Sequence, residues 1–184
     1  SGFRVDMAGA LVKGPGGGEA TARFWTEIRA WLDRDYPEAV LVAEWAQPHL
    51  AIPAGFHMDF MLPFGTPGYI SLWRKEHGDG GNHDPYGASY FDASGRGNLN
   101  EFLDNYLYHY NRTKGLGHIA IPTGNHDSGP RIGTGRSLEQ IELIYLFLLA
   151  MPGTPFIYYG DEIGMRSVAG LPSKEGGYQR TAIR

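Results

Sequence analysis

The sequence predicts an α/β protein built around a parallel β-sheet. Short apolar runs with strand character alternate with longer segments whose apolar residues recur at helical spacing, and this alternation is typical of βαβ units. The run Val40–Ala43 is apolar throughout, as expected of a strand that is covered on both faces of a parallel sheet. Carboxylates directly follow several of these runs, so acidic side chains are expected at the carboxyl ends of the strands.

Three strands and one helix are expected in the first third of the chain. The apolar runs with strand character there are residues 2–7 (GFRVDM), 40–43 (VLVA) and 56–62 (FHMDFML). The first of these is interpreted as a short buried strand. Residues 20–33 have helical spacing. The expected buried face of this helix consists of four large apolar residues: Phe24, Ile28, Trp31 and Leu32.

The middle of the chain combines a long connection with a second helix. Residues 63–97 are too long for a plain connector and are expected to be functional or partly helical near residues 69–75. Asn98 is predicted to cap the helix that follows, with Glu101 at its third position.

The last part is expected to add two strands and a third helix. The strands are the runs 118–122 (HIAIP) and 155–159 (PFIYY). Ser137 and Gln140 form a predicted capping box. The helix behind it, residues 138–150, is apolar on most sides and is therefore expected to be deeply buried.

Composition excludes several classes of protein. A chain of 184 residues is long enough for one domain with a real core. Its net charge of −4 and its lack of basic runs argue against nucleic acid and anionic membranes as partners. Cysteine is absent, which excludes disulfides and thiolate sites and fits either a cytoplasmic protein or a disulfide-free secreted one. No apolar stretch reaches the roughly 18 residues of a membrane helix.

Three carboxylates lie at or just past the ends of predicted strands: Asp6, Glu44 and Asp127. The carboxyl ends of parallel strands share one edge, and in a (β/α)8 barrel the active site is built on that edge. Converging carboxylates suit glycoside hydrolysis, in which one attacks the sugar and one donates a proton. In retaining enzymes these two groups lie about 5–5.5 Å apart.

Two neighbours fit this chemistry. Arg4 lies two residues before Asp6 and therefore on the same face of its strand, where its charge favours an ionised Asp6. Trp45 follows Glu44 and offers apolar surroundings that raise the pKa of a carboxylic acid.

Each motif also has a plainer interpretation. A single Asp or Glu at a strand end is commonly a cap or turn residue. The segment Asn125-His126-Asp127 suits a turn before a capped helix, or part of a metal site.

The motifs together resemble those of the α-amylase family of retaining glycosidases and transglycosylases. GFRVD, VAEW and TGNHD are similar to its second, third and fourth signature regions, and YGDEIGM (residues 159–165) is similar to the motif after its last barrel strand. The resemblance implies Asp6 as nucleophile, Glu44 as general acid/base and Asp127 as stabiliser of the transition state. It implies Arg4 and His126 as residues around the glucosyl ring.

Three further residues complete the predicted substrate-binding set: Asn125, Trp45 and Arg131. Arg131 has an alternative interpretation as a solvent-exposed loop arginine.

The resemblance also implies a partial barrel. In that family the nucleophile lies on the fourth strand, so residues 1–184 are expected to be the C-terminal part of a (β/α)8 catalytic domain, strands four to eight. The chain is thus expected to be a fragment that lacks the first three strands. Residues 177–184 resemble an internal loop of the family.

One departure narrows the expected activity. Gly9 and Ala10 stand where many members of the family have Lys-His, and Lys13 comes later. This argues against a typical starch endo-amylase and removes one usual calcium contact. It favours action on short oligosaccharides, or transfer. No cofactor is expected to be required, and these residues do not support a structural calcium.

Other polar groups have weaker interpretations. A Gly-rich loop contains a candidate metal cluster, which is otherwise a solvated loop over the cleft: His77, Asp79, His83 and Asp84. Asp59 is interpreted as structural, and Asp161 and Glu162 as ordering the loop after the last strand. The aromatic pairs 90–91 and 158–159 either stack on sugars or pack in a core.

The sequence therefore predicts a retaining hydrolase or transglycosylase of α-glucosidic bonds, acting on α-glucans or short α-gluco-oligosaccharides by double displacement. Three alternatives stay open: an inactive fragment that aggregates or dimerises through open sheet edges, a sugar-binding remnant without turnover, and a metal-dependent hydrolase using His77, His83 and His126. Sequence leaves the compartment and the oligomeric state open.

Overall fold

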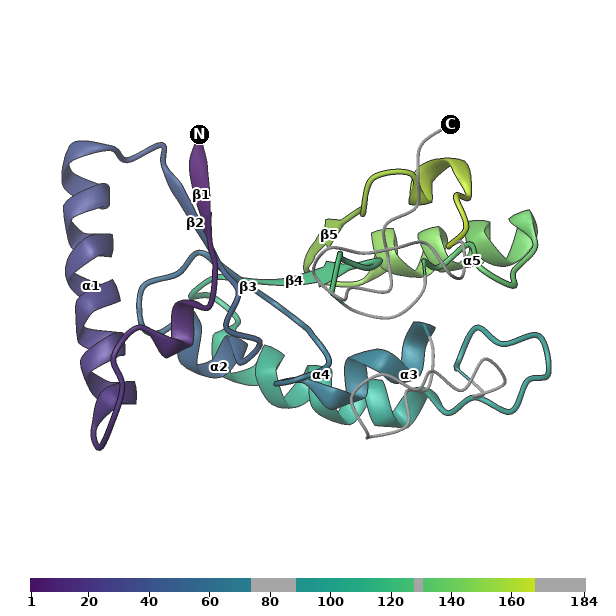
Figure 1. Ribbon diagram of the computed structural model, residues 1–184, viewed down its shortest axis with the longest axis horizontal. Coiled ribbons are helices and arrows are strands. Elements are labelled where there is room, and N and C mark those ends of the chain that lie inside the picture. The colour runs from purple at the N-terminus through teal and green to yellow at the C-terminus, as the bar shows by residue number, and fades with distance from the viewer. Residues whose placement is uncertain (74–88, 128–130, 168–184) are drawn as a thin grey trace. The chain divides into compact units, whose positions relative to one another are not determined.

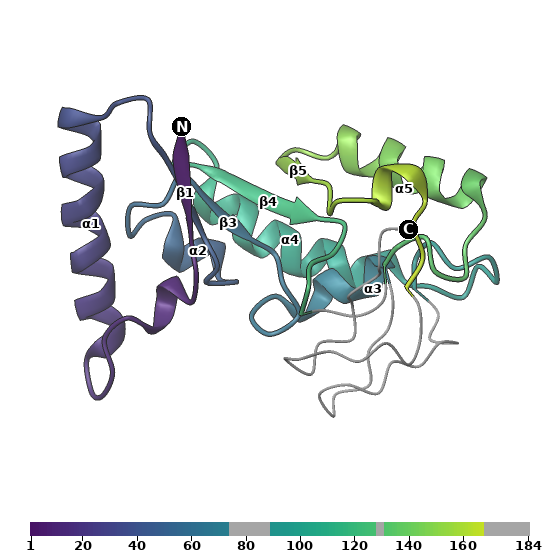
Figure 2. The ribbon, with the colours of Figure 1, turned by 45° about the horizontal axis from the view of Figure 1, so that its top comes forward.

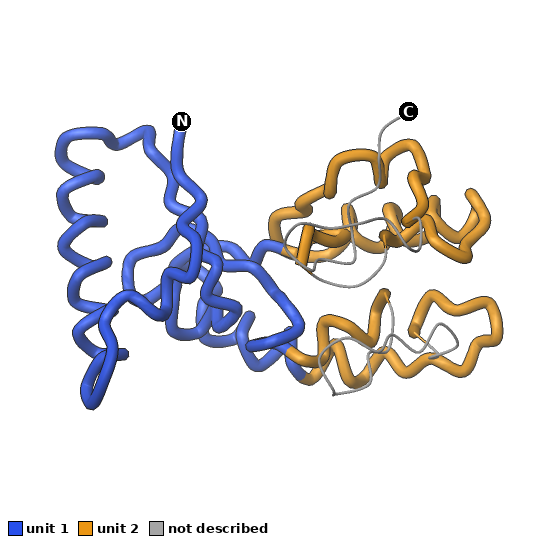
Figure 3. Tube along the Cα trace, viewed as in Figure 1, with its two compact units in different colours: residues 1–66, 105–120 blue, residues 67–104, 121–184 orange. Residues whose placement is uncertain are grey.

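The computed structural model describes residues 1–73, 89–127 and 131–167. Strands and helices alternate along the chain (Figure 1). The chain divides into two compact units (Figure 3). The first unit contains Ser1–Thr66 and Asn105–Ala120, and the second contains Pro67–Asp104 and Ile121–Arg184. The proposed metal cluster between residues 77 and 84 lies outside the described residues.

The strands of the described chain form one sheet, in which their spatial order follows their order in the sequence. They are β1 (Gly2–Val5), β2 (Val40–Ala43), β3 (Met58–Phe60), β4 (His118–Pro122) and β5 (Thr154–Phe156). The neighbours from β1 to β4 pair in parallel, and Figure 2 shows β3 and β4 side by side. The predicted α/β class with a parallel sheet is therefore confirmed.

The core of the first unit joins the long helix α1 (Gly17–Asp35) to β2 and to the segment before β3. Trp25 is central to it. Its indole N–H donates to the carbonyl of Ala8 at 2.9 Å, and its ring lies 4.9 Å from that of Phe56. The contact fastens α1 to the turn after β1, which is the turn that carries Asp6.

The predicted buried face of α1 is partly wrong. Leu32 is buried and Ile28 packs against the core, as expected. Phe24 and Trp31 are 40% and 43% exposed, however, and Trp25 is buried in their place. The reason is the hydrogen bond of the Trp25 indole, which selects the orientation of the helix.

The first strand is also less buried than expected. β1 ends at Val5, and Phe3 is 67% exposed. β1 lies at one end of the strand order and pairs with one neighbour, β2. Of the other two strands whose bounds differ from the prediction, β3 is shorter at both ends, and β5 begins one residue earlier and ends three residues earlier.

Three of the four remaining α-helices in the described residues lie where the sequence predicts helical structure, whereas the four-residue helix after β2 was not predicted. The four are α2 (Pro48–Ala51), α3 (Ile70–Trp73), α4 (Leu99–Thr113) and α5 (Leu138–Ala150). The Asn98 side chain accepts the backbone N–H of Asn100 at 2.9 Å, in the first turn of α4. No helix of the described chain has the length and apolar character needed to cross a membrane.

The capping box of α5 is confirmed. Ser137 Oγ accepts the backbone N–H of Gln140 at 3.4 Å, and Gln140 Oε1 accepts that of Ser137 at 3.0 Å. The expected deep burial is wrong for one side of α5, because four of its leucines are more than half exposed: Leu138, Leu143, Leu146 and Leu149. Its buried side contains Ile141, Ile144 and Leu148.

Replacement of Ser137 by alanine removes the acceptor for the first turn of α5. We expect Ser137→Ala to lower the free energy of unfolding by about 1 kcal/mol, measured by urea unfolding with circular dichroism. Ser137→Asp keeps an acceptor at this position and serves as the control. Equal losses in the two variants would contradict a capping role.

Acid is expected to destabilise the first unit through two neighbouring histidines, of which His109 is buried and His49 half-buried. The rings of His49 and His109 lie 5.0 Å apart, and their Nδ1 atoms are buried without a hydrogen-bond partner in the described chain. Burial, followed by the charges of His49 and Arg112, lowers the pKa of His109 to about 4.

Because the unfolded chain binds a proton at this site below about pH 6.5 and the folded chain only near pH 4, stability is lost as the pH falls through this window. The loss approaches about 1.4 kcal/mol per pH unit. His109→Gln should flatten the profile measured by urea unfolding, whereas the exposed His118, changed to Gln, should leave it unaltered. An equally steep acid limb in His109→Gln contradicts the assignment.

Candidate active site

The first unit brings Arg4, Asp6 and Glu44 together. Val5 pairs with Ala43 in the β1–β2 register, so the next residue of each strand, Asp6 and Glu44, leaves the same end of the sheet. The backbone N–H of Glu44 donates to the carbonyl of Val5 at 2.9 Å, which continues the ladder up to the site.

Arg4 bridges the two carboxylates. Its Nη1 lies 2.7 Å from Asp6 Oδ1, and its Nη2 lies 2.7 Å from Glu44 Oε2. A guanidinium can contact two acids in this way because its N–H donors form a planar fork. The position of Arg4 two residues before Asp6 is what allows the contact, as the sequence predicted.

The two carboxylates lie in different environments. The Asp6 side chain is 72% exposed, whereas that of Glu44 is 7% exposed. Burial raises the pKa of Glu44, a hydrogen bond from its protonated form to Asp6 raises it further, and the charge of Arg4 lowers it. The site therefore contains one accessible carboxylate and one buried carboxyl group that retains its proton more readily.

The backbone beyond each carboxylate is unusual. In the described chain, the non-glycine residues with positive φ are Met7 (φ 47°) and Ala46 (φ 59°). Met7 directly follows Asp6, and Ala46 is two residues after Glu44. Such conformations are uncommon for residues with a side chain and collect at functional sites. They are an independent sign that this end of β1 and β2 is the site.

Trp45 lies on the core side of this site. Its ring is half-buried and lies 6.5 Å from that of Phe56. A Cβ atom at Gly9 would come within 2.4 Å of its Nε1 atom. Trp45 thus fills the space above Gly9, and its predicted contact with substrate stays a prediction.

Asp127 belongs to the second unit, beyond the end of β4. Asn125 Oδ1 accepts the backbone N–H of Asp127 at 3.0 Å, and His126 Nε2 lies 3.2 Å from Asp127 Oδ2. The side chains of His126 and Asp127 are 51% and 60% exposed. The three residues form a tight polar turn, and the meeting of Asp127 with Asp6 and Glu44 stays a prediction.

Arg131 is buried, so the interpretation as an exposed loop arginine is wrong. It is 1% exposed, and its Nη1 donates to Asp161 Oδ1 at 3.1 Å and to the carbonyl of Tyr159. Its guanidinium also lies over the rings of Tyr158 and Tyr159, 4.3 and 4.6 Å from their centroids. These contacts make Arg131 an anchor of the loop after β5.

Asp161 orders that loop, as the sequence indicated. It is fully buried, and Thr123 Oγ1 donates to its Oδ2 at 2.6 Å. The same hydroxyl accepts the backbone N–H of Tyr158 at 2.9 Å. The segment after β4 and the segment after β5 are therefore tied together within the second unit.

Asp59 is a residue whose importance the sequence understated. It is fully buried in β3, and its carboxylate accepts the backbone N–H groups of Trp45, Ala46 and Gln47 at 2.9, 3.2 and 2.8 Å. The sequence contained a signal for this role, because an Asp inside the otherwise apolar run MDFML indicates a buried carboxylate that accepts hydrogen bonds.

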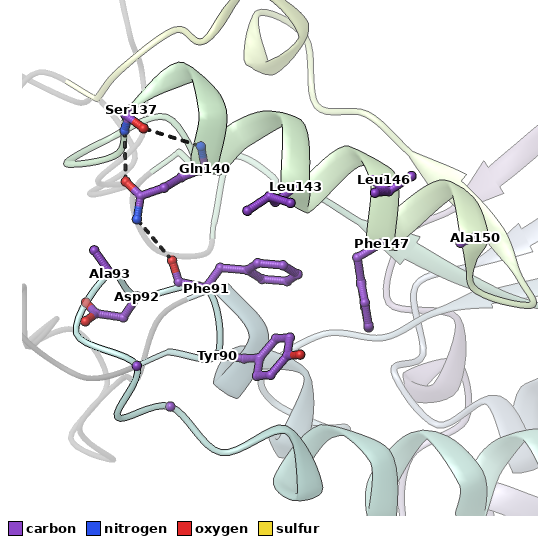
Figure 4. Close-up of a pocket in the computed structure, with 12 residues that line it drawn as sticks. Tyr90, Phe91, Asp92, Ala93, Ser137, Gln140, Leu143, Leu146, Phe147 and Ala150 are labelled. Atoms are coloured by element: carbon purple, nitrogen blue, oxygen red, sulfur yellow. Dashed lines mark hydrogen bonds between the residues drawn. The ribbon is translucent and has the colours of Figure 1, made fainter.

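The second unit also contains an apolar groove of about 850 Å³ between α5 and the segment before α4 (Figure 4). Two rings that line it, those of Phe91 and Phe147, meet edge-on at 5.4 Å, and Phe91 also stacks on Trp73 outside the lining at 5.8 Å. For Phe91 these contacts favour core packing over the stacking on sugars that the sequence left open. Asp92 is the groove's acidic residue.

Metal binding finds no support in the described ranges. Within residues 1–73, 89–127 and 131–167, no three His, Asp or Glu side chains are grouped closely enough to hold a metal ion. The expectation that no cofactor is required stays untested.

One family model and several known proteins match all or part of the chain. The family model described as "Alpha amylase, catalytic domain" matches residues 1–183. A 4-alpha-glucanotransferase from Thermotoga neapolitana is 39% identical over 166 residues, which are 85% of this chain and 30% of that protein. A cyclomaltodextrinase from Geobacillus thermopakistaniensis is 50% identical over 44 residues, 23% of this chain and 7% of that protein.

The fold comparison agrees. The crystal structure of a trehalulose synthase from Pseudomonas mesoacidophila MX-45 superposes with a TM-score of 0.63 at 20% identity, over 95% of this chain and 33% of that chain. This likeness confirms the predicted fold, part of a (β/α)8 barrel. The chain spans a third or less of the length of each of these proteins. It belongs to the α-amylase family, whose catalytic-domain model it matches from residue 1 to residue 183.

Proposed function

We propose that this chain supplies the nucleophile and the general acid/base for retaining cleavage or transfer at α-glucosidic bonds. The observation that carries the proposal is the contact of Arg4 with one exposed and one buried carboxylate. The relatives named glucanotransferase and cyclomaltodextrinase support α-glucans or short α-gluco-oligosaccharides as the substrate class.

In the first step, Asp6 attacks the anomeric carbon and Glu44 donates its proton to the departing oxygen. A covalent glucosyl ester forms on Asp6. In the second step, the Glu44 carboxylate takes a proton from water or from a sugar hydroxyl, which attacks the ester and releases the product. Asp127 is proposed to stabilise the positive charge that develops on the sugar ring in the transition state of each step, with Asn125 and His126 as binding residues.

The environment of Glu44 suits both of its roles. Asp6 and burial raise its pKa, which favours the protonated form needed to assist departure of the leaving group. Once Asp6 is esterified, its contribution disappears while that of Arg4 remains, and the pKa of Glu44 falls. The same residue is then better suited to act as the base.

The presence of glycine at position 9, where many members of the family have lysine, has a steric cause. With the Trp45 ring where it is, a side chain at position 9 would collide with it. The Lys side chain that many relatives have at this position is therefore absent from the leaving-group side. This supports action on short substrates, or transfer, over endo-cleavage of starch.

Loss of the nucleophile gives the direct test. Asp6→Asn should lower the rate of hydrolysis of an aryl α-glucoside by more than about 10³-fold, because the covalent step needs an ionised carboxylate. An activated fluorinated glucosyl donor should leave its sugar on the peptide that contains Asp6, detected by mass spectrometry.

Asp33→Asn, which alters an exposed carboxylate paired with Arg29 on α1, is the matched control. Undiminished hydrolysis in Asp6→Asn, or sugar binding without turnover or labelling in the unchanged chain, contradicts the proposal. The second result would favour a sugar-binding role.

The Arg4 contact also predicts opposite shifts for the pKa of Glu44. Because Asp6 raises this pKa and Arg4 lowers it, Asp6→Asn should move it down and Arg4→Met should move it up. Carbon NMR of chains labelled at the glutamate carboxyl measures both shifts, with Glu44→Gln to assign the resonance. Shifts in the same direction would show that the two side chains do not act on Glu44 as the contacts indicate.

A further inference from the structure

Glu44 directly follows β2, and Asp59 of the neighbouring strand β3 holds the turn after it. Asp59 lies opposite Ala43 in the β2–β3 register, one residue before Glu44. From this position its carboxylate reaches past the end of β2. It accepts three successive backbone N–H groups of the turn, those of residues 45, 46 and 47.

These contacts determine where the Glu44 side chain emerges. The N–H of Trp45, held by Asp59, belongs to the same peptide group as the Glu44 carbonyl, which accepts the N–H of Ala8 at 3.2 Å. The Glu44 N–H is fixed on Val5. With the peptides on both sides of its Cα immobilised, the direction in which the Glu44 side chain leaves the backbone is fixed, and the contact with Arg4 holds its carboxylate.

The turn does not hold this shape by its own preference. Ala46 has a φ of 59°, a conformation that disfavours any side chain with a Cβ atom, and it is completely buried. Gly65 packs so closely on it that a Cβ atom there would come within 2.2 Å of the Ala46 carbonyl oxygen. Three N–H donors converging on one buried carboxylate offset this strain.

We propose that Asp59 is a positioning residue for the general acid/base: through the backbone of residues 45–47 it holds Glu44 beside Arg4 and Asp6. This rests on the role proposed for Glu44. Asp59 itself is fully buried and is not proposed to touch substrate. The family comparison matches the domain as a whole and assigns nothing to this residue.

A positioning role predicts selective damage. Asp59→Asn should lower kcat/KM by roughly 10- to 100-fold for an alkyl or unactivated aryl α-glucoside, whose leaving group needs a well-placed acid. For α-glucosyl fluoride, whose leaving group needs little protonation, the change should stay below about threefold. Thr113→Val, which removes a buried hydroxyl at the end of α4, is the control for general loss of stability and should affect both substrates equally.

A second readout does not need turnover. In the carboxyl-labelled chain, Asp59→Asn should move the pKa of Glu44 toward its ordinary value, because a loosened turn hydrates a carboxyl group whose pKa is raised mainly by burial. Thr113→Val should leave it in place. If the unchanged chain shows no turnover but Asp59→Asn still shifts the pKa of Glu44 in this way, the proposed function is contradicted. The conclusion that Asp59 positions Glu44 would then still stand.

The unchanged chain provides a test if Asp59→Asn does not fold. Burial raises the pKa of Asp59 to about 7, against the effect of the backbone donors. As Asp59 titrates, the amide resonances of residues 45–47 should shift together, and the Glu44 carboxyl resonance should show a second step at the same pH. Two results overturn the proposal. One is an equal loss of kcat/KM on both substrates in Asp59→Asn together with an unchanged pKa of Glu44. The other is a Glu44 carboxyl resonance in the unchanged chain that shows no second step when Asp59 titrates.

Discussion

The two-sided contact of Arg4 is the interaction on which the site depends. A buried carboxylate such as Glu44 is unfavourable without a partner, and an arginine that served it alone would favour its ionised form too strongly for an acid. Because the same guanidinium also holds the exposed Asp6, the positive charge is shared. The charge state of each carboxylate then depends on the other, and the proposed double displacement requires this dependence because Asp6 would lose its charge on forming the ester.

Each unit supports a loop beyond its strands with a fully buried aspartate. In the first unit, Asp59 on β3 holds the turn after β2. In the second, Asp161 after β5 holds Thr123, just past β4, together with Arg131. A buried carboxylate accepts several hydrogen bonds at once, so it can fix irregular backbone that no strand pairing reaches. The ends of the strands thus have defined shapes despite their short lengths.

Local signals made part of this structure predictable. The bounds of β2, β4 and α5 and the Ser137 capping box depend on neighbours in the sequence and are confirmed. The buried face of α1 was missed because it depends on a distant partner: Trp25, and not Phe24, meets the turn after β1. The outward side of α5 is marked in the sequence by Glu142, which lies four residues from both Leu138 and Leu146. For the site, spacing located Arg4, Asp6 and Glu44 together. Arg131 was misjudged, because its partner Asp161 lies 30 residues away.

The contrast between local signals and distant contacts also explains why Gly9 departs from the family pattern. Taken alone, a glycine in place of a lysine suggests only a lost contact with the leaving group. The structure adds that Trp45 occupies the space where any side chain at position 9 would begin. Trp45 is held by Asp59 through its backbone and by the Phe56 ring. The absence of the lysine is therefore coupled to the way in which β3 secures the turn after Glu44, so position 9 and the proposed acid/base residue share one packing arrangement. A lysine at position 9 would require a smaller residue at position 45.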